Sequence, residues 1–223
     1  MTGNGVSYSL GKFPIEPLID NRQYAPATQR NRNAILEVLL RVLPQKGTVL
    51  EIASGTGEHS VFFAPHLQPR QWIPSDPNPI AIASITDWQK HQPSDNFAAP
   101  IQLDVTTTDW QQRLVNQDIQ AIVNINMIHI APWKACLGLI SGAKKLLSAQ
   151  GILYLYGPFK QKGKHTSESN AEFDANLRYE NPEWGVRDIE EVIAIAADQN
   201  LILKEIKPMP ANNLSVIFQA MAP

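Results

Sequence analysis

The sequence predicts an α/β fold in which a mostly parallel sheet is covered by helices on both faces. Short apolar runs alternate with stretches of i, i+3, i+4 apolar spacing, an order typical of neighbouring parallel strands. A turn of small residues at 53–57 joins the first strand to a helix, a layout typical of nucleotide-binding proteins. Two alternating runs close the chain, at 201–207 and 214–219, and predict an antiparallel pair of strands. With 223 residues, we expect one domain over 1–223.

The elements follow from periodicity and from their end signals. Apolar runs predict strands at 48–52, 71–75, 99–103, 121–126 and 152–156. One-sided apolar spacing predicts helices at 31–43, 58–67, 79–91, 108–116, 132–148 and 187–199, with Pro44 and Gly151 as end signals. Residues up to about 29 and residues 159–186 have no clear pattern. The second segment is longer than ordinary connections, so we expect it to be functional, partly helical, or both.

Composition narrows the range of partners. The net charge is −2 and the 19 Lys and Arg are scattered, so we expect no nucleic-acid partner. No apolar run approaches the roughly 18 residues of a membrane span, so we expect no membrane partner and a cytoplasmic protein. The single cysteine, Cys136, falls in an apolar helical pattern and is expected to be a passive core thiol. The five histidines lack ligand spacing, so no metal is expected.

The turn at 53–57 indicates which ligand to expect. Gly55 and Gly57 let the backbone pass close to a bulky ligand, and Glu51 ends the preceding apolar run. A dinucleotide fold requires G-x-G-x-x-G and a phosphate at the helix start, but here Glu58 would repel that phosphate. The ligand that fits has a nucleoside, a cationic end and no phosphate. S-adenosylmethionine (SAM) meets this description, and S-adenosylhomocysteine (SAH) is its demethylated product.

The chain resembles class I SAM-dependent methyltransferases along nearly its whole length. Four segments carry the resemblance: 49–57, Asp76 at the end of the second strand, 103–105, and 124–127. It implies a Rossmann-like, seven-stranded, mostly parallel sheet with a C-terminal antiparallel hairpin. It also implies that Asp76 accepts both ribose hydroxyls, that Asp104 and Val105 hold the adenine, and that Glu51 helps to hold the methionine end. The implied cofactor residues are Glu51, Ala53, Ser54, Gly55, Gly57, His59, Asp76, Pro77, Asp104, Val105, Asn124, Asn126, Met127, Arg30 and Asn31.

These assignments have simpler structural alternatives. Asp76, before Pro77-Asn-Pro79, could only cap the next helix, and Asp104 could be a turn residue. Ala53 stands where many members of the superfamily have glycine, which makes the turn more crowded.

A closer resemblance is to the poorly characterised family that includes methyltransferase-like protein 26. The less generic segments carry it: 24–33, 124–133, 156–159, 169–174, 184–188 and 209–213. The resemblance supplies no substrate. It implies that residues 1–33 form a lid, with Tyr24, Arg30 and Asn31 as lid residues, and that residues 159–186 are an insertion on the acceptor side.

Methyl transfer can proceed largely by positioning and desolvation, with a base only where the acceptor must lose a proton. His129 is the best base, because it follows the fourth strand and ordinarily titrates near neutrality; a structural histidine is the alternative. Asn126 and Tyr156 could orient the acceptor, although Tyr156 could be an ordinary strand residue. We expect a small-molecule acceptor, with a carboxylate or phosphate suited to two arginines beside aromatics. The expected acceptor residues are Tyr24, Trp133, Phe159, Arg178, Trp184 and Arg187.

Two other functions are weighed against a methyltransferase. The first is a non-catalytic module that keeps the fold, binds SAM or SAH, and serves in protein interaction. The second is a nicotinamide-dependent dehydrogenase, disfavoured by Glu58 and by the terminal hairpin. The oligomeric state and the acceptor atom are not indicated by the sequence.

Overall fold

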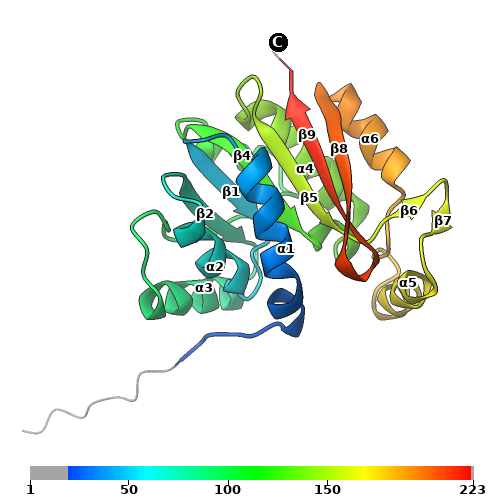
Figure 1. The fold of residues 1–223 in the computed structure, drawn as a ribbon, viewed down its shortest axis with the longest axis horizontal. Coiled ribbons are helices and arrows are strands. Elements are labelled where there is room, and N and C mark those ends of the chain that lie inside the picture. The colour runs from blue at the N-terminus through cyan, green and yellow to red at the C-terminus, as the bar shows by residue number, and fades with distance from the viewer. Residues whose placement is uncertain (1–19, 222–223) are drawn as a thin grey trace, which may run out of the picture.

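One seven-stranded sheet organises the molecule (Figure 1). The computed structural model describes residues 20–221. The strand order is β3-β2-β1-β4-β5-β9-β8, and only β9 runs against its neighbours. This confirms the α/β fold and the C-terminal antiparallel pair. The strands of the sheet are β1 Thr48–Ile52, β2 Gln71–Asp76, β3 Ile101–Gln102, β4 Ile119–Ile125, β5 Ile152–Gly157, β8 Leu201–Met209 and β9 Asn213–Ala220.

Helices cover both faces of the sheet because successive strand residues point to opposite sides. In β1, Val49 packs in a core with α1, α2 and α3, whereas Leu50 and Ile52 pack in a core with α4 and α6. Figure 1 shows α1 crossing one face, with α4 behind the sheet. The helices are α1 Pro26–Val42, α2 Glu58–His66, α3 Pro79–His91, α4 Trp133–Leu146, α5 Glu168–Glu180 and α6 Ile189–Asp198, with 3-10 turns η1 Trp110–Leu114, η2 Met127–His129 and η3 Pro210–Asn212.

Several boundaries differ from the sequence prediction. Helix α1 begins at Pro26 rather than at residue 31, since proline is favoured in the first turn. The strand expected at 99–103 keeps only two ladder residues, because β3 is an edge strand paired with β2 alone. The helix expected at 108–116 is the short turn η1. Gly151 does not end α4, which already stops at Leu146.

The chain before α1 is attached to α3. The backbone N–H of Asn21 donates to Asp87 Oδ2 at 2.9 Å, and that of Gln23 donates to Ser84 Oγ at 2.8 Å. Trp88 Nε1 in turn donates to the Gln23 carbonyl at 3.1 Å. Residues 20–25 of the predicted lid are therefore fixed to the body of the protein, and residues 1–19 lie outside the described part.

The segment 159–186 forms a small unit of its own, with the hairpin β6 Lys160–Gln161 and β7 Lys164–His165 followed by α5. Asp174, on α5, accepts from Lys160 Nζ at 3.0 Å, Arg178 Nε at 3.1 Å and the Val186 N–H at 2.7 Å. His165 Nε2 lies 3.2 Å from the same carboxylate. One buried carboxylate thus joins the hairpin, the helix and the loop that follows it.

None of the helices between residues 20 and 221 has both the length and the apolar composition required to cross a membrane. In the same range, no three His, Cys, Asp or Glu side chains gather as metal ligands do.

Candidate functional site

Two cavities open near the carboxyl ends of the parallel strands, where α/β sheets bind ligands. The first cavity, of about 310 Å³, has mainly apolar walls and the Asp104 carboxylate in its lining. A neighbouring hollow of about 570 Å³ shares Pro77, Leu103 and Asp104 with it. The first cavity is lined by Ile52, Ala53, Pro77, Leu103, Asp104, Val105, Thr106, Met127, Ala131, Pro132, Lys134 and Ala135.

The turn after β1 is left-handed at three positions. Ala53, Gly55 and Gly57 have φ of 58°, 56° and 86°. A Cβ on Gly57 would lie 2.9 Å from Ile85, so this glycine allows α2 and α3 to pack closely, whereas a Cβ on Gly55 would meet no atom within 4 Å. Gly55 therefore leaves open space on its side of the turn. Ala53 adopts a conformation that costs an L-residue with a Cβ about 1–2 kcal/mol.

The two aspartates hold turns at the ends of β2 and β3. Asp76 Oδ2 accepts from the Gly55 N–H at 2.9 Å, and Asp76 Oδ1 accepts from the Asn78 N–H at 2.9 Å. Asp104 Oδ1 accepts from the Thr106 N–H at 2.8 Å. A carboxylate has about four lone-pair sites, so both side chains retain capacity to accept further donors. The predicted helix cap is instead Asn78, whose side chain accepts from the Ile80 N–H.

Glu51 lies beneath the turn rather than in the first cavity. Its carboxylate accepts from Ser60 Oγ on α2 and from Trp72 Nε1 on β2, the latter at 3.0 Å. Burial raises the pKa of the Glu51 carboxyl, although these hydrogen bonds oppose the shift. Ser54 connects the turn to β2, since its hydroxyl accepts from the Ser75 N–H at 3.1 Å. Neither side chain lines the first or the second cavity.

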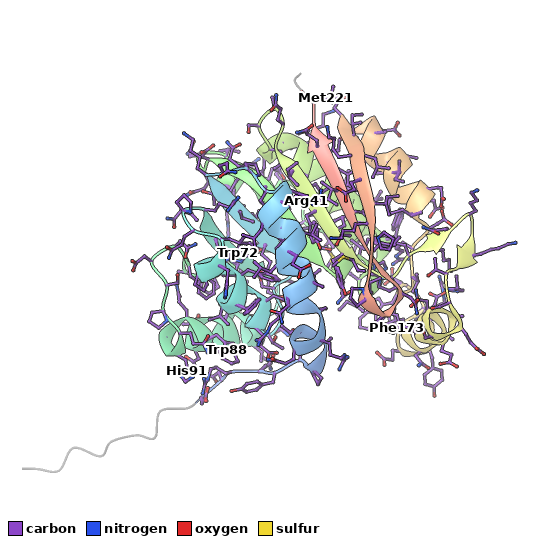
Figure 2. The ribbon with its side chains drawn as sticks, viewed as in Figure 1. Arg41, Trp72, Trp88, His91, Phe173 and Met221 are labelled. Atoms are coloured by element: carbon purple, nitrogen blue, oxygen red, sulfur yellow. The ribbon has the colours of Figure 1, made fainter. Side chains whose placement is uncertain are left out.

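The second cavity, of about 720 Å³, lies on the other side of η2. It is bordered by the start of α1, the ends of β4 and β5, the first half of α5 and the β8–β9 loop. Figure 2 shows Phe173 on α5, on the side toward that loop. The lining residues are Ala27, Arg30, Asn31, Asn126, Ile130, Tyr156, Pro158, Ser169, Asn170, Phe173, Pro210, Ala211 and Asn213.

A short wall separates the two cavities. Met127 and Ala131 line the first cavity, and their neighbours Asn126 and Ile130 line the second. Asn126 has φ of 65°, and its N–H donates to the Tyr156 carbonyl at 2.8 Å, which fixes the corner between β4 and η2. Groups held in the two cavities would approach each other at this corner.

His129 does not reach the second cavity. Its side chain is 0 % exposed and packs edge-on against Phe159, with ring centroids 5.0 Å apart. Burial, with a smaller contribution from the Arg187 charge, lowers the pKa of His129 to about 3. Neither ring nitrogen has a hydrogen-bond partner among the described residues. His129 therefore lacks the access that a general base for an acceptor in this cavity requires.

Asn126 and Tyr156, which we expect to orient an acceptor, both line the second cavity. Burial raises the pKa of the Tyr156 phenol, and a hydrogen bond with Asn31 partly offsets this effect. Asn31 Oδ1 also lies 2.8 Å from Nε2 of the half-buried His59, and loss of solvation lowers the pKa of that ring to about 4. His59 is thus a neutral support for Asn31, one residue removed from the cavity.

Arg187 and Trp133 form a structural clamp. Arg187 Nε donates to the Ile128 carbonyl at 2.9 Å, and Nη2 donates to the carbonyls of Ala131 and Glu183 at 2.7 and 2.8 Å. The guanidinium also lies over Trp133, 5.4 Å from the ring centre. Since these carbonyls occupy the guanidinium, the expectation that Arg187 binds an acceptor anion is not met.

The remaining expected acceptor residues also lie outside the lining. Arg178 pairs with Asp174, and Phe159 is fully buried beside His129. Trp184 follows α5, and its N–H donates to the Asn181 carbonyl. Tyr24 packs edge-on against Trp88 on α3, 63 % exposed. Asn124, expected at the cofactor, is buried and donates from Nδ2 to the Ile52 carbonyl at 2.9 Å.

The sequence did contain a signal for the residues that were missed. Ser169, Asn170, Phe173, Ala211 and Asn213 line the second cavity. All five fall in the less generic segments 169–174 and 209–213 that carry the closer family resemblance. The prediction of acceptor residues from charge and aromatic character selects Arg178, Arg187 and Trp184 instead.

Solved structures with similar folds agree with this architecture. An O-methyltransferase family protein from Burkholderia thailandensis matches with a TM-score of 0.73 at 12 % identity, over 88 % of this chain and 57 % of that one. An O-methyltransferase family 2 protein from Planctomyces limnophilus, in complex with apigenin, matches with a TM-score of 0.68 at 15 % identity (85 % and 62 %). CalO1, a methyltransferase of calicheamicin biosynthesis in its SAH-bound form, matches with a TM-score of 0.64 at 14 % identity (85 % and 54 %).

The fold is therefore that of class I SAM-dependent methyltransferases. This chain spans little more than half of the length of those structures. Residues 22–220 match the family described as "Protein of unknown function (DUF938)", and the chain belongs to that family.

Proposed function

We propose that the protein is a SAM-dependent methyltransferase that acts on a small-molecule acceptor. The observation that carries the proposal is the pair of cavities on either side of the Asn126–Met127 corner. A methyl donor in the first cavity and an acceptor in the second would meet there, and such positioning can supply much of the catalysis.

The residues around the first cavity fit SAM. The apolar walls formed by Leu103, Val105 and Met127 suit a flat purine, and Asp104 could accept its amino group. Asp76 lies next to the cavity residue Pro77, and we propose that its carboxylate, which also accepts from the Gly55 N–H, binds the ribose hydroxyls.

Bound in the first cavity, SAM would supply an activated methyl group for transfer to an acceptor lone pair; sulfur would keep the electron pair of the broken bond, and any acceptor proton would leave to solvent. The chain's own contribution is to hold the acceptor. The Tyr156 phenol stays protonated at neutral pH, since burial raises its pKa, and can donate a hydrogen bond. Asn126 can accept one from an amine or hydroxyl. We propose both as positioning residues, with no role for His129 as a base.

One observation favours a second candidate, a non-catalytic module that binds SAM or SAH. Apart from Tyr156 and Arg30, the lining of the second cavity has no ionisable side chain. Acceptors that must lose a proton would therefore find little assistance. Cofactor binding with no turnover across an acceptor screen would favour this candidate.

The predictions of family kinship, cellular location, domain number and partners rest on the sequence. We propose kinship with the family that includes methyltransferase-like protein 26 on sequence resemblance alone, carried by segments such as 169–174 and 209–213. The cytoplasmic location, the single domain and the absence of a nucleic-acid partner stay predictions.

Calorimetric titration with SAM and SAH tests the proposal, using Gly55→Ala and Gly163→Ala as a matched pair. Both glycines have left-handed φ, 56° and 72°, and at both a Cβ would meet no atom within 4 Å. Their backbone strain should be comparable, but Gly163 lies in the β6–β7 turn. We expect Gly55→Ala to weaken binding by about tenfold or more and Gly163→Ala to leave it unchanged. Folded wild-type protein that binds neither compound would refute the proposal.

A further inference from the structure

The second cavity contains a cationic side chain that has no partner among residues 20–221. Arg30, on the first turns of α1, lines the cavity and is exposed. Among the described residues, no hydrogen bond or ion pair engages its guanidinium. The other arginines near this region have partners: Arg178 pairs with Asp174, and Arg187 donates to three backbone carbonyls. Arg30 is thus available to a ligand.

The charge of Arg30 is also not neutralised within the cavity. The lining contains neither Asp nor Glu. An anionic ligand would therefore meet an attractive charge and no nearby carboxylate in the wall. Because a guanidinium presents paired donors in one plane, a carboxylate is the group that it binds bidentately.

The rest of the lining describes the body of the ligand. Ile130, Pro158 and Phe173 give apolar surface. Asn170 is held in place, since Nδ2 donates to Thr166 Oγ1 and to the Asn212 carbonyl, each at 3.0 Å. A cavity of about 720 Å³ suits a ligand of ordinary metabolite size.

We propose that the second cavity binds a small aromatic carboxylic acid, with its carboxylate on Arg30 and its ring against Phe173. That this acid is the methyl acceptor rests on the proposed function. That the cavity binds such an acid does not depend on the proposed function. One cation balances one negative charge, which favours a carboxylate over a doubly charged phosphate. Arg30 then sets substrate charge, while Asn126 and Tyr156 contact the opposite end of the acceptor.

Matched acids and amides test the proposal. The probes are 4-hydroxybenzoate against 4-hydroxybenzamide and indole-3-acetate against indole-3-acetamide, titrated into the protein with and without SAH. Within each pair the shape is kept and only the charge differs. We expect wild-type protein to prefer each acid by about tenfold. Preference for the amides, or no binding of any acid at concentrations on the order of 1 mM, would overturn the proposal.

Two variants locate the effect. Arg30→Gln should reduce the acid preference to about twofold or less, whereas Arg41→Gln should retain it. Arg41 is the charge-matched control: it lies on the same helix, pairs with Glu205, and is far from Phe173 in Figure 2. If the Arg30→Gln variant still prefers the acids, the assignment of Arg30 as the carboxylate-binding residue is wrong. If the wild-type protein binds 4-hydroxyphenyl phosphate more tightly than 4-hydroxybenzoate, the ligand is a phosphate and not a carboxylate. If the protein binds the acids but neither SAM nor SAH, the binding-site proposal is supported and the methyltransferase proposal is refuted.

Discussion

Two buried carboxylates, Glu51 under the first cavity and Asp174 on the helix that borders the second, are held in opposite ways. Glu51 is 2 % exposed and Asp174 is 5 % exposed. Glu51 meets the neutral donors Ser60 and Trp72, so burial dominates and raises its pKa. Burial acts on Asp174 too, but hydrogen bonds from Lys160, Val186 and Arg178 lower its pKa below the usual range. The hydrogen-bond partners, rather than burial alone, therefore decide the direction of each pKa shift. The contributions of Glu51 and Asp174 to the free energy of unfolding should depend on pH in opposite ways.

The largest expected effect follows from removing the charge at Asp174. Asp174→Asn leaves Lys160 and Arg178 without their counter-charge, and we expect a loss of about 3 kcal/mol in the free energy of unfolding at pH 7. The folded pKa lies below the unfolded value of 3.8, so this stability is present above that pH and is lost as the pH falls through the folded pKa. Urea unfolding at pH 7 and pH 3 should therefore show the gap between wild type and variant narrowing in acid.

Asp95→Asn serves as the control for Asp174→Asn, because Asp95 is exposed and has no side-chain hydrogen bond in the described range. It should change the free energy of unfolding by less than about 0.5 kcal/mol. A gap that stays constant with pH would show that Asp174 acts through packing and not through its charge.

Glu51→Gln should show the opposite pH dependence and a smaller effect. The folded pKa of Glu51 is raised, so its favourable contribution belongs to the protonated form and is lost as the pH rises through the folded pKa. Glutamine does not titrate and can still accept from Trp72. We expect unfolding free energies within about 1 kcal/mol of each other at pH 7, with the variant gaining relative to wild type as the pH rises.

The same variant tests the role implied for Glu51 at the methionine end of the cofactor. Because the side chain lies beneath the turn, we expect SAM affinity to fall by no more than about threefold. Calorimetry showing a loss of tenfold or more at unchanged stability would restore Glu51 as a direct ligand, with about 1.4 kcal/mol at stake.

The smallest effect concerns two alanines, one beside each cavity. Ala53 and Ala211 have φ of 58° and 55°. Glycine relieves that strain but adds entropy to the unfolded chain, so Ala53→Gly and Ala211→Gly should each raise the free energy of unfolding by up to about 1 kcal/mol. Ala197→Gly, in the regular helix α6, should lower it by about 0.5–1 kcal/mol. Thermal unfolding of all three variants checks the signs, and destabilisation by both of the first two would contradict the strain argument.

The two regions also differ in how far the sequence could describe them. Around the first cavity, Ala53, Pro77, Asp104, Val105 and Met127 each directly follow a strand or its turn. Strand periodicity therefore brings them to one edge of the sheet before any tertiary contact is known. The C-terminal pair could be expected from its two alternating runs, whereas the seven-stranded arrangement was implied only by the family resemblance.

The second cavity depends on packing between segments far apart in the chain. Arg30, Asn170 and Ala211 come from α1, α5 and the β8–β9 loop. No local pattern sets the orientation of α5, which is fixed by the contacts of Asp174. The arginines illustrate the difficulty, because sequence alone does not reveal that backbone carbonyls occupy Arg187 while Arg30 has no partner in the part of the chain that the structure describes.

The wall at residues 126–131 has a thermodynamic consequence. Since neighbouring residues of one short segment face both cavities, a ligand that orders this segment from one side changes the free energy of binding on the other. Such linkage is reciprocal, so an acceptor that tightens SAM binding by some factor must itself be bound more tightly by the same factor when SAM is present. The order in which two ligands are added can alter the kinetics of assembly, but not this shared factor.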